Sequence, residues 1–312
     1  IGSALFKKPA YKNIVVNELI LDKKGIKMSK SKGNVIDPFN IMEEFGADAV
    51  RWYLFVNNPP WRATRFNKND LAKTVISDFF RSLTNTYAFF ALYANIDKFN
   101  GQEQEVPVSE RPEIDRWIIS RTQTLLREYT ELMDTYELTK AHRVIQSFVV
   151  DELSNWYIRR NRRRFWKGEK DSDKIAAYQT LRTVLIEVLK LMSPAAPFLS
   201  EDLYQRLKND NDPESIHLSD FTKPSEELID LDLEEKMAAA QTITSLARSL
   251  REKAELKVRQ PLRRLLIPVG GEKQQKAIES VGNIIKEELN IRKIEFVNQE
   301  EADIDRRVEK AN

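Results

Sequence analysis

Residues 71–99 read LAKTVISDFFRSLTNTYAFFALYANIDKF, and this stretch decides the fold class. Apolar side chains recur there at intervals of three or four residues, at Leu71, Val75, Phe79, Leu83, Tyr87, Phe90 and Ala94. That spacing gathers them on one side of an α-helix, so the stretch predicts a long amphipathic helix with a buried face.

The same period returns three times downstream, at residues 114–136, 138–166 and 175–192, and glycine and proline residues separate these runs. Four long helices with short connections predict an antiparallel helical bundle over residues 63–222, and hence a mainly α fold. Residues 209–225 are polar and contain two prolines, so we expect a linker at this end of the bundle.

The two flanks of the bundle carry different patterns. Residues 14–21 (IVVNELIL) precede a turn-like DKKG sequence and predict a buried strand. Its partner strands are expected to lie outside this chain, so residues 1–62 are interpreted as the end of a sheet domain with a connecting segment. At the other end, residues 223–312 predict a helix followed by strand, helix and strand, which is a small α/β appendage.

The connecting segment contains helix start and stop signals. Asp37 followed by Pro38 is typical of a helix N-cap and first turn, and Gly46 is expected to end that helix. Asp48 is then expected to cap the next helix, and the Asn58-Pro59-Pro60 sequence stops it.

Composition excludes several classes of site. The 312 residues include no cysteine, and the two histidines, His142 and His217, are far apart, so disulfides, a zinc site and other structural metals are not expected. No apolar run approaches a membrane span and no signal peptide opens the sequence, so we expect a cytoplasmic protein that binds no membrane. The net charge of +2 means that nucleic-acid binding would depend on local basic clusters.

One such cluster is the loop Lys27-Met28-Ser29-Lys30-Ser31-Lys32-Gly33-Asn34. Lysine ammonium groups and serine hydroxyls on a loop with glycine flanks suit a polyphosphate, because the loop can close over the charge that develops during phosphate displacement. The alternative is a solvated basic turn without a ligand.

This loop resembles the second signature of class I aminoacyl-tRNA synthetases over its whole length. The resemblance implies that Lys27, Met28, Ser29, Lys30 and Ser31 bind ATP, with Lys30 as the contacting catalytic residue and Lys27 as its helper, while Mg²⁺ organises the phosphates. The other signature of that family, His-x-Gly-His, is absent, because neither His142 nor His217 stands in such a context. By this resemblance the chain holds an incomplete active site and is expected to be inactive alone.

Within that family, residues 46–54 (GADAVRWYL) and 59–62 (PPWR) resemble the isoleucine-specific members. The resemblance implies isoleucine, ATP and an isoleucine-accepting tRNA as substrates, and a monomer. The physical role of Trp52, Tyr53 and Trp61 is interpreted as core packing. Two alternatives stay open: a valine- or leucine-specific member, and a non-catalytic helical RNA-binding protein.

Residues 155–167 (NWYIRRNRRRFWK) hold five arginines in six positions between aromatic residues. Guanidinium groups bind phosphates and flat rings stack on bases, so the segment predicts RNA binding. It also resembles the Asn-Trp-Tyr-Ile-Arg-Arg motif of the family's anticodon-binding domain. The candidates for tRNA contact are Arg159, Arg160, Arg162, Arg163, Arg164 and Trp166.

We expect a division among these arginines, with Arg159 and Arg160 structural and residues 162–164 available to RNA. The alternative is that the arginines pair with acidic side chains of neighbouring helices and that the tryptophans belong to the core. A second basic cluster, at residues 257–264, is a further candidate for RNA contact, although a solvated surface run is the favoured interpretation.

Overall fold

The computed structural model describes residues 2–298. The chain divides into two compact units, Ile1–Ile229 and Asp230–Asn312. Unit 1 opens with a segment of short elements: α1 (Gly2–Phe6), β1 (Ile20–Leu21), η1 (Lys30–Lys32), α2 (Pro38–Phe45), α3 (Ala47–Asn57) and β2 (Thr64–Arg65). The predicted signals hold for α2, because the Asp37 carboxylate accepts a hydrogen bond from the Phe39 amide at 2.9 Å and Gly46 follows with φ of 86°.

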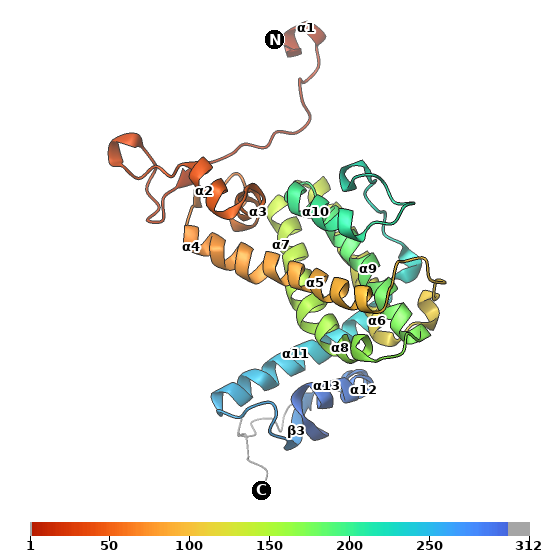
Figure 1. The fold of residues 1–312 in the computed structure, drawn as a ribbon. Coiled ribbons are helices and arrows are strands. Elements are labelled where there is room, and N and C mark those ends of the chain that lie inside the picture. The colour runs from red at the N-terminus through yellow and green to blue at the C-terminus, as the bar shows by residue number, and fades with distance from the viewer. Residues whose placement is uncertain (1, 299–312) are drawn as a thin grey trace. The chain divides into compact units, whose positions relative to one another are not determined.

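The rest of unit 1 is a bundle of long helices, which Figure 1 shows in orange to green around α5, α6, α7 and α9. Its elements are α4 (Lys68–Asp70), η2 (Leu71–Phe80), α5 (Arg81–Ile96), η3 (Val108–Glu110), α6 (Glu113–Asp134), α7 (Leu138–Ser147), η4 (Phe148–Ile158), α8 (Arg159–Trp166), α9 (Ser172–Met192), α10 (Pro197–Leu207), η5 (Ile216–Leu218) and η6 (Glu226–Leu228). α4, η2 and α5 follow one another without a break, as do α7, η4 and α8, and η2 and η4 are π-helical. The four predicted helices and the mainly α fold are confirmed.

Neighbouring helices of the bundle run antiparallel. Between α6 and the α7–η4–α8 helix, Tyr129 lies beside His142 and Asp115 contacts Tyr157. Residue numbers therefore rise along one helix as they fall along the other, which makes the pair antiparallel. The core is closed by the predicted apolar stripe and its partners. Trp52 of α3 is fully buried and stacks on Phe79 with ring centroids 4.7 Å apart. Such aromatic pairs add geometric preference to the burial of large apolar surfaces.

The predicted eight-residue buried strand at 14–21 is wrong. Only Ile20 and Leu21 form a strand, which pairs in parallel with Thr64 and Arg65, and Ile14 is 66% exposed. Apart from the ladder with β2, among residues 2–298 the backbone of this run contacts only the Pro60 carbonyl, through the Glu18 amide at 2.8 Å, and Lys27, through a bridge from Leu21, and residues 14–20 are all exposed. An apolar run with few backbone hydrogen-bond partners and no apolar cover does not form an interior strand.

The expected linker at residues 209–225 is packed against the bundle. Ile216 of η5 is buried, its amide donates to Glu201 at 2.9 Å, and the Ser225 amide donates to Gln123 at 2.8 Å. Polar side chains and prolines therefore mark an irregular segment here, but one that the bundle holds in place through its backbone.

Unit 2 contains α11 (Leu231–Lys253), β3 (Leu262–Val269), α12 (Glu272–Ser280), α13 (Gly282–Leu289) and β4 (Ile291–Asn298). β3 and β4 pair in parallel, with Leu262 opposite Ile291, as the strand, helix and strand pattern predicts. The basic cluster at 257–264 lies on the surface of this unit, and Arg264 pairs with Glu295 at 3.1 Å. Among the helices of residues 2–298, none combines the length and apolarity that a membrane crossing requires.

Candidate functional site

The lysine loop is closed at its base by Asn34. Its side-chain amide donates to the Asp22 carboxylate at 2.9 Å and to the Lys27 carbonyl at 3.3 Å, and its oxygen accepts from the Ser29 amide at 2.9 Å. The hydrogen bond from Asn34 and those from backbone amides lower the pKa of Asp22. The loop between Asp22 and Asn34 is thus fixed at its ends.

The tip of the loop exposes its charges. Lys30, Ser31 and Lys32 form a single 3₁₀ turn that Gly33 ends with φ of 63°, a left-handed conformation that glycine adopts without strain. Met28 and Ser29 are half-buried, whereas Lys27 and Lys30 are exposed. Across residues 2–298, the ammonium groups of Lys27, Lys30 and Lys32 form no ion pair. Three lysines that project from a loop fixed at its base can bind a polyanion such as a triphosphate.

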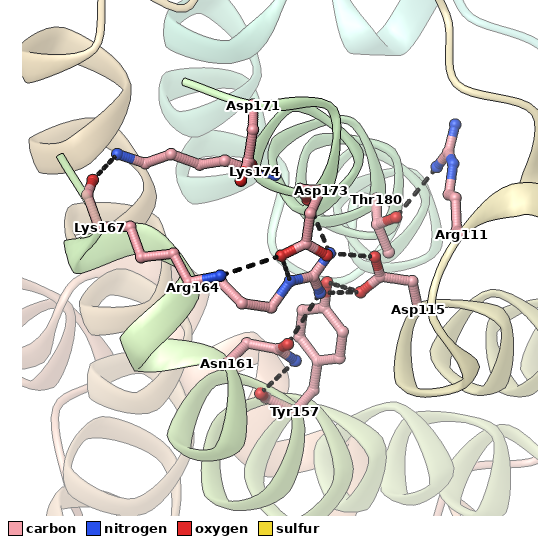
Figure 2. Close-up of polar contacts among 10 residues, drawn as sticks. All are labelled: Arg111, Asp115, Tyr157, Asn161, Arg164, Lys167, Asp171, Asp173, Lys174 and Thr180. Carbon is pink, nitrogen blue, oxygen red and sulfur yellow. Dashed lines mark hydrogen bonds and ion pairs between the residues drawn. The ribbon is translucent and has the colours of Figure 1, made fainter. Parts of the chain in front are cut away.

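The arginine-rich helix α8 is anchored from inside by Arg164 (Figure 2). Its guanidinium donates to both carboxylate oxygens of Asp115 at 2.8 Å, to Asn161 at 2.9 Å, and to the Asp173 backbone carbonyl at 2.8 Å. The Arg164 side chain is 13% exposed and Asp115 is fully buried. The expectation that Arg164 is available to RNA is therefore wrong, because all its donors are engaged by the bundle.

The polar network around Arg164 is electrostatically coupled. Burial disfavours the charge of Arg164, but its hydrogen bonds and charge attraction with Asp115 outweigh burial and raise its pKa. Burial and then the neighbouring Asp115 charge raise the pKa of Tyr157, whose hydroxyl donates to Asp115 at 2.7 Å. On the next helix, buried Lys174 pairs with Asp97 at 2.5 Å. The contacts of Arg164 hold α8 against α6 and α9, and the pair of Lys174 with Asp97 holds α9 against the end of α5.

Arg162, Arg163 and Trp166 face solvent on the same helix, and Trp166 is 58% exposed. In the part of the chain that the structure describes, neither Arg162 nor Arg163 has a side-chain hydrogen bond or ion pair. Arg159 and Arg160 are half-buried, each with its guanidinium 5.8 Å from the centre of the Trp156 ring. The expectation that these two are structural agrees with that packing, and Trp156 is core, as the alternative interpretation held.

Three residues that hold these sites were not singled out from the sequence: Asn34, Asp115 and Lys174. For Asp115 and Lys174, the sequence does contain a pattern that indicates a buried charge. Asp115 stands in the apolar stripe that continues at Ile118 and Ile119, and Lys174 precedes Ala177 and Tyr178 at helical spacing. A charged residue on a buried helix face must be paired, so each predicted a partner on a neighbouring helix.

Comparison with known proteins matches both sites to families. The family profile for tRNA synthetases class I (I, L, M and V) matches residues 1–67, and that for the anticodon-binding domain of tRNA ligase matches residues 115–266. The isoleucine–tRNA ligase of Cytophaga hutchinsonii is 48% identical over 300 residues, or 95% of this chain. Those of Bacteroides thetaiotaomicron and Thermus thermophilus are 47% and 42% identical over 96% and 99% of it.

The chain belongs to the isoleucine–tRNA ligase family. It spans 27%, 26% and 30% of the lengths of those three ligases, respectively. The lysine loop lies in the part matched to class I synthetases, and α8 lies in the anticodon-binding part.

A solved structure supports the fold independently. A leucyl-tRNA synthetase in a ternary complex from Agrobacterium radiobacter superposes with a TM-score of 0.52 over 69% of this chain and 24% of that chain. At 23% sequence identity this likeness concerns the fold alone. It agrees with a mainly α architecture built around the helical bundle.

Proposed function

We propose that this chain supplies the ATP-loop and tRNA-binding parts of an isoleucine–tRNA ligase. Such an enzyme joins isoleucine to ATP as an aminoacyl adenylate, releases pyrophosphate, and transfers the isoleucyl group to its tRNA with release of AMP. The observation that carries the proposal is the pair Arg162 and Arg163, which stand exposed and unpaired among residues 2–298, inside the stretch matched to anticodon-binding domains.

Helix α8 suits an RNA backbone because its inner and outer faces are chemically separated. Arg164, Asn161 and Phe165 hold the helix to the bundle, while Arg162 and Arg163 place two guanidinium groups in solvent. Guanidinium groups fork onto phosphate oxygens, and the exposed Trp166 ring offers a stacking surface for an unpaired base. The helix is fixed before RNA arrives, so little ordering of its backbone opposes binding.

The lysine loop suits the phosphates of ATP. The exposed ammonium groups of Lys27 and Lys30 can follow charge that develops on the α-phosphate when the isoleucine carboxylate attacks it, and Met28, Ser29 and Ser31 complete the loop. Residues 2–298 contain no cluster of three or more metal-binding side chains. We assign Mg²⁺ to the ATP phosphates of the whole ligase, because Mg²⁺ at nucleotide sites keeps several waters and binds chiefly to phosphate oxygens.

Titration of the 312-residue chain with tRNA tests the RNA part. An Arg162→Ala, Arg163→Ala variant should bind isoleucine-accepting tRNA more weakly, and the slope of log affinity against log salt should become shallower by roughly 1.4–1.8, or 0.7–0.9 per phosphate contact. Arg206→Ala, which removes an arginine that is 57% exposed on α10, is the matched control and should leave the slope unchanged. A valine-accepting tRNA measures specificity.

Equal affinity and slope for the native chain and the double variant would rule out this face as the RNA contact. The ATP part needs a full-length ligase that contains this segment. There Lys30→Ala should slow adenylate formation by about 100-fold, which corresponds to roughly 3 kcal/mol of transition-state stabilisation. A fall of less than tenfold would show that Lys30 does not contact the reacting phosphate.

We further propose that the ligase acts as a monomer in the cytoplasm. ATP and free tRNA meet there, and each of the two units of the chain packs its own apolar core without a second copy. Sedimentation of the purified chain at two concentrations tests the first point, since a dimer would sediment faster at the higher one.

A further inference from the structure

Helix α3 begins at a joint with the bundle. One carboxylate oxygen of Asp48 accepts a hydrogen bond from the Leu199 amide at 2.6 Å. One turn later, the guanidinium of Arg51 donates to the backbone carbonyls of Ala195 at 3.0 Å and Pro194 at 2.8 Å. Two oppositely charged side chains of α3 therefore engage the segment where α9 ends and α10 begins.

This arrangement serves both helix ends at that break. α10 begins at Pro197 and its N-cap residue, Ala196, has no side-chain acceptor, so Asp48 supplies the negative charge that the free amides of the first turn require. Arg51 supplies donors to carbonyls that no longer belong to α9. Asp48 is 7% exposed, so its carboxylate contacts the first turn of α10 rather than solvent. Burial raises its pKa, and the hydrogen bonds from the Leu199 and Phe198 amides oppose that rise because they favour the charged form.

The other end of α3 is held in the same manner. Arg143 of α7 donates to the backbone carbonyls of Val56 at 2.7 Å and Asn57 at 2.6 Å, the last residues of α3. A cation at the C-terminus of a helix is stabilised by the helix dipole, and a planar guanidinium can serve two carbonyls together. Thus α3 is fixed to the bundle at both termini by charged side chains that contact main-chain atoms.

The lysine loop is attached to α3. The Tyr53 hydroxyl accepts from the Asn67 amide and Asn57 donates to the Arg65 carbonyl at 3.0 Å, which ties β2 to α3. β2 pairs with β1, and Leu21 of β1 bridges to Lys27 across the base of the loop. The orientation of the loop base therefore depends on the orientation of α3.

The arginine face is attached to the same joint by a continuous helix. Arg143 and Arg163 both belong to the unbroken run from α7 through η4 to α8, and 20 residues separate them. At the rise of an α-helix this would be about 30 Å, and the π-helical part over Phe148–Ile158 makes it somewhat shorter. One helical rod thus connects the C-terminus of α3 with the side chains proposed to bind tRNA.

We propose that Asp48, Arg51 and Arg143 are positioning residues that hold the ATP loop at a fixed orientation to the tRNA-binding face of α8. They touch neither ATP nor RNA. They would keep a tRNA bound along α8 at a fixed distance and orientation from a nucleotide bound under the lysine loop. This inference rests on the proposed function, but the rigidity of the joint can be measured without any ligand.

Distance measurements between two spin labels test the joint in the 312-residue chain. The native sequence contains no cysteine, so Glu43→Cys on α2 and Glu131→Cys on α6, both exposed, give two unique labelling sites. Pulsed electron resonance should show a narrow distance distribution in this parent. Arg51→Ala, Arg143→Ala and Asp48→Ala should each broaden it, and the Arg51→Ala, Arg143→Ala double variant should broaden it by about twofold or more.

Matched variants separate positioning from stability. Arg143→Lys should broaden the distribution almost as much as Arg143→Ala, because lysine lacks the rigid planar fork with which the guanidinium holds both carbonyls. Arg206→Ala, which removes a solvent-exposed arginine of α10, should not broaden it. All distances are measured well below the melting temperature of each variant. Arg51 is exposed, so Arg51→Ala should stay folded and test the joint even if Asp48→Ala does not fold.

A second arm adds saturating isoleucine-accepting tRNA. The variants should bind it with affinity within about twofold of the parent yet keep the broad distribution, because α8 itself is unchanged. Distributions that stay narrow in all variants, or that tRNA restores to the parent's width, would overturn the positioning role. Failure of the parent to bind tRNA would instead overturn the proposed function, while the ligand-free distributions would still decide the joint.

Discussion

Replacing Arg164 with methionine removes one partner of a buried ion pair while keeping the length of the side chain. Asp115 is fully buried and accepts two hydrogen bonds from Arg164 and one from Tyr157. Without Arg164 the carboxylate keeps only the tyrosine hydroxyl in an interior that cannot solvate it. Breaking such a pair costs about 3–5 kcal/mol, so we expect the free energy of unfolding of unit 1 to fall by about 4 kcal/mol.

Urea unfolding followed by far-ultraviolet circular dichroism measures this loss. With a denaturant slope of about 2–3 kcal/mol per molar urea, the midpoint should fall by about 1.3–2 M. Arg163→Met is the matched control, because it removes the neighbouring but exposed arginine, and it should change the unfolding energy by less than about 0.5 kcal/mol. An Asp115→Leu, Arg164→Met double variant removes both charges and should lose at least about 2 kcal/mol less than the sum of the single losses.

Equal midpoints for Arg164→Met and Arg163→Met would refute the reasoning, since they would mean that the buried pair contributes no more than an exposed side chain. Additive single and double losses would also contradict it, because the two groups would then not be coupled. Either result would make Arg164 a candidate for RNA binding again.

Three other substitutions follow from the same structure. Lys174→Met leaves the Asp97 carboxylate without its buried partner and should cost roughly 3 kcal/mol in urea unfolding. Burial opposes the charge of Asp97, but hydrogen bonds from Lys174 and Tyr178 outweigh burial and lower its pKa below the ordinary 3.8. The stabilisation from this carboxylate is therefore present above pH 3.8 and is lost as the pH falls through the lowered pKa. Asp97→Asn should make the unfolding free energy depend less on pH between about pH 5 and pH 2. Burial against Phe55 and Trp52 lowers the pKa of His142 below 6.5, so the unfolded chain takes up the proton first and stability falls by up to about 1.4 kcal/mol per pH unit below 6.5. Melting temperatures at pH 7.5 and 5.5 should differ less for His142→Phe than for the parent.

The helices were predictable because their signal is local. Apolar spacing predicted helices at 71–99, 114–136, 138–166 and 175–192, and the structure has helices over 68–96, 113–134, 138–166 and 172–192. Each boundary is set by residues within a few positions of it. The lysine loop was also identified locally, because its charges and glycines are contiguous in the sequence.

The strand at 14–21 and the arginine assignment failed for non-local reasons. Strand formation needs a partner elsewhere in the chain, and among residues 2–298 the run has only the two-residue ladder with Thr64 and Arg65 and a single bridge from Leu21 to Lys27. The helix that carries the arginines is π-wound over Phe148–Ile158, so more residues fill each turn and the phase calculated for an α-helix shifts before α8. Arg164 then faces Asp115, whereas Arg162 and Arg163 face solvent. Asp48 caps a helix 151 residues away rather than its own, which no local pattern reveals.

The joint at α3 has a consequence for how such sequences diverge. Each of Asp48, Arg51 and Arg143 contacts an amide or a carbonyl of the backbone, which every residue type supplies apart from the missing amide of proline. Substitutions at positions 195 or 56 can therefore be accepted without a compensating change at 51 or 143. Residues in contact usually change together in families of related sequences. We expect no such paired substitutions at this contact, even though it joins segments far apart in the chain.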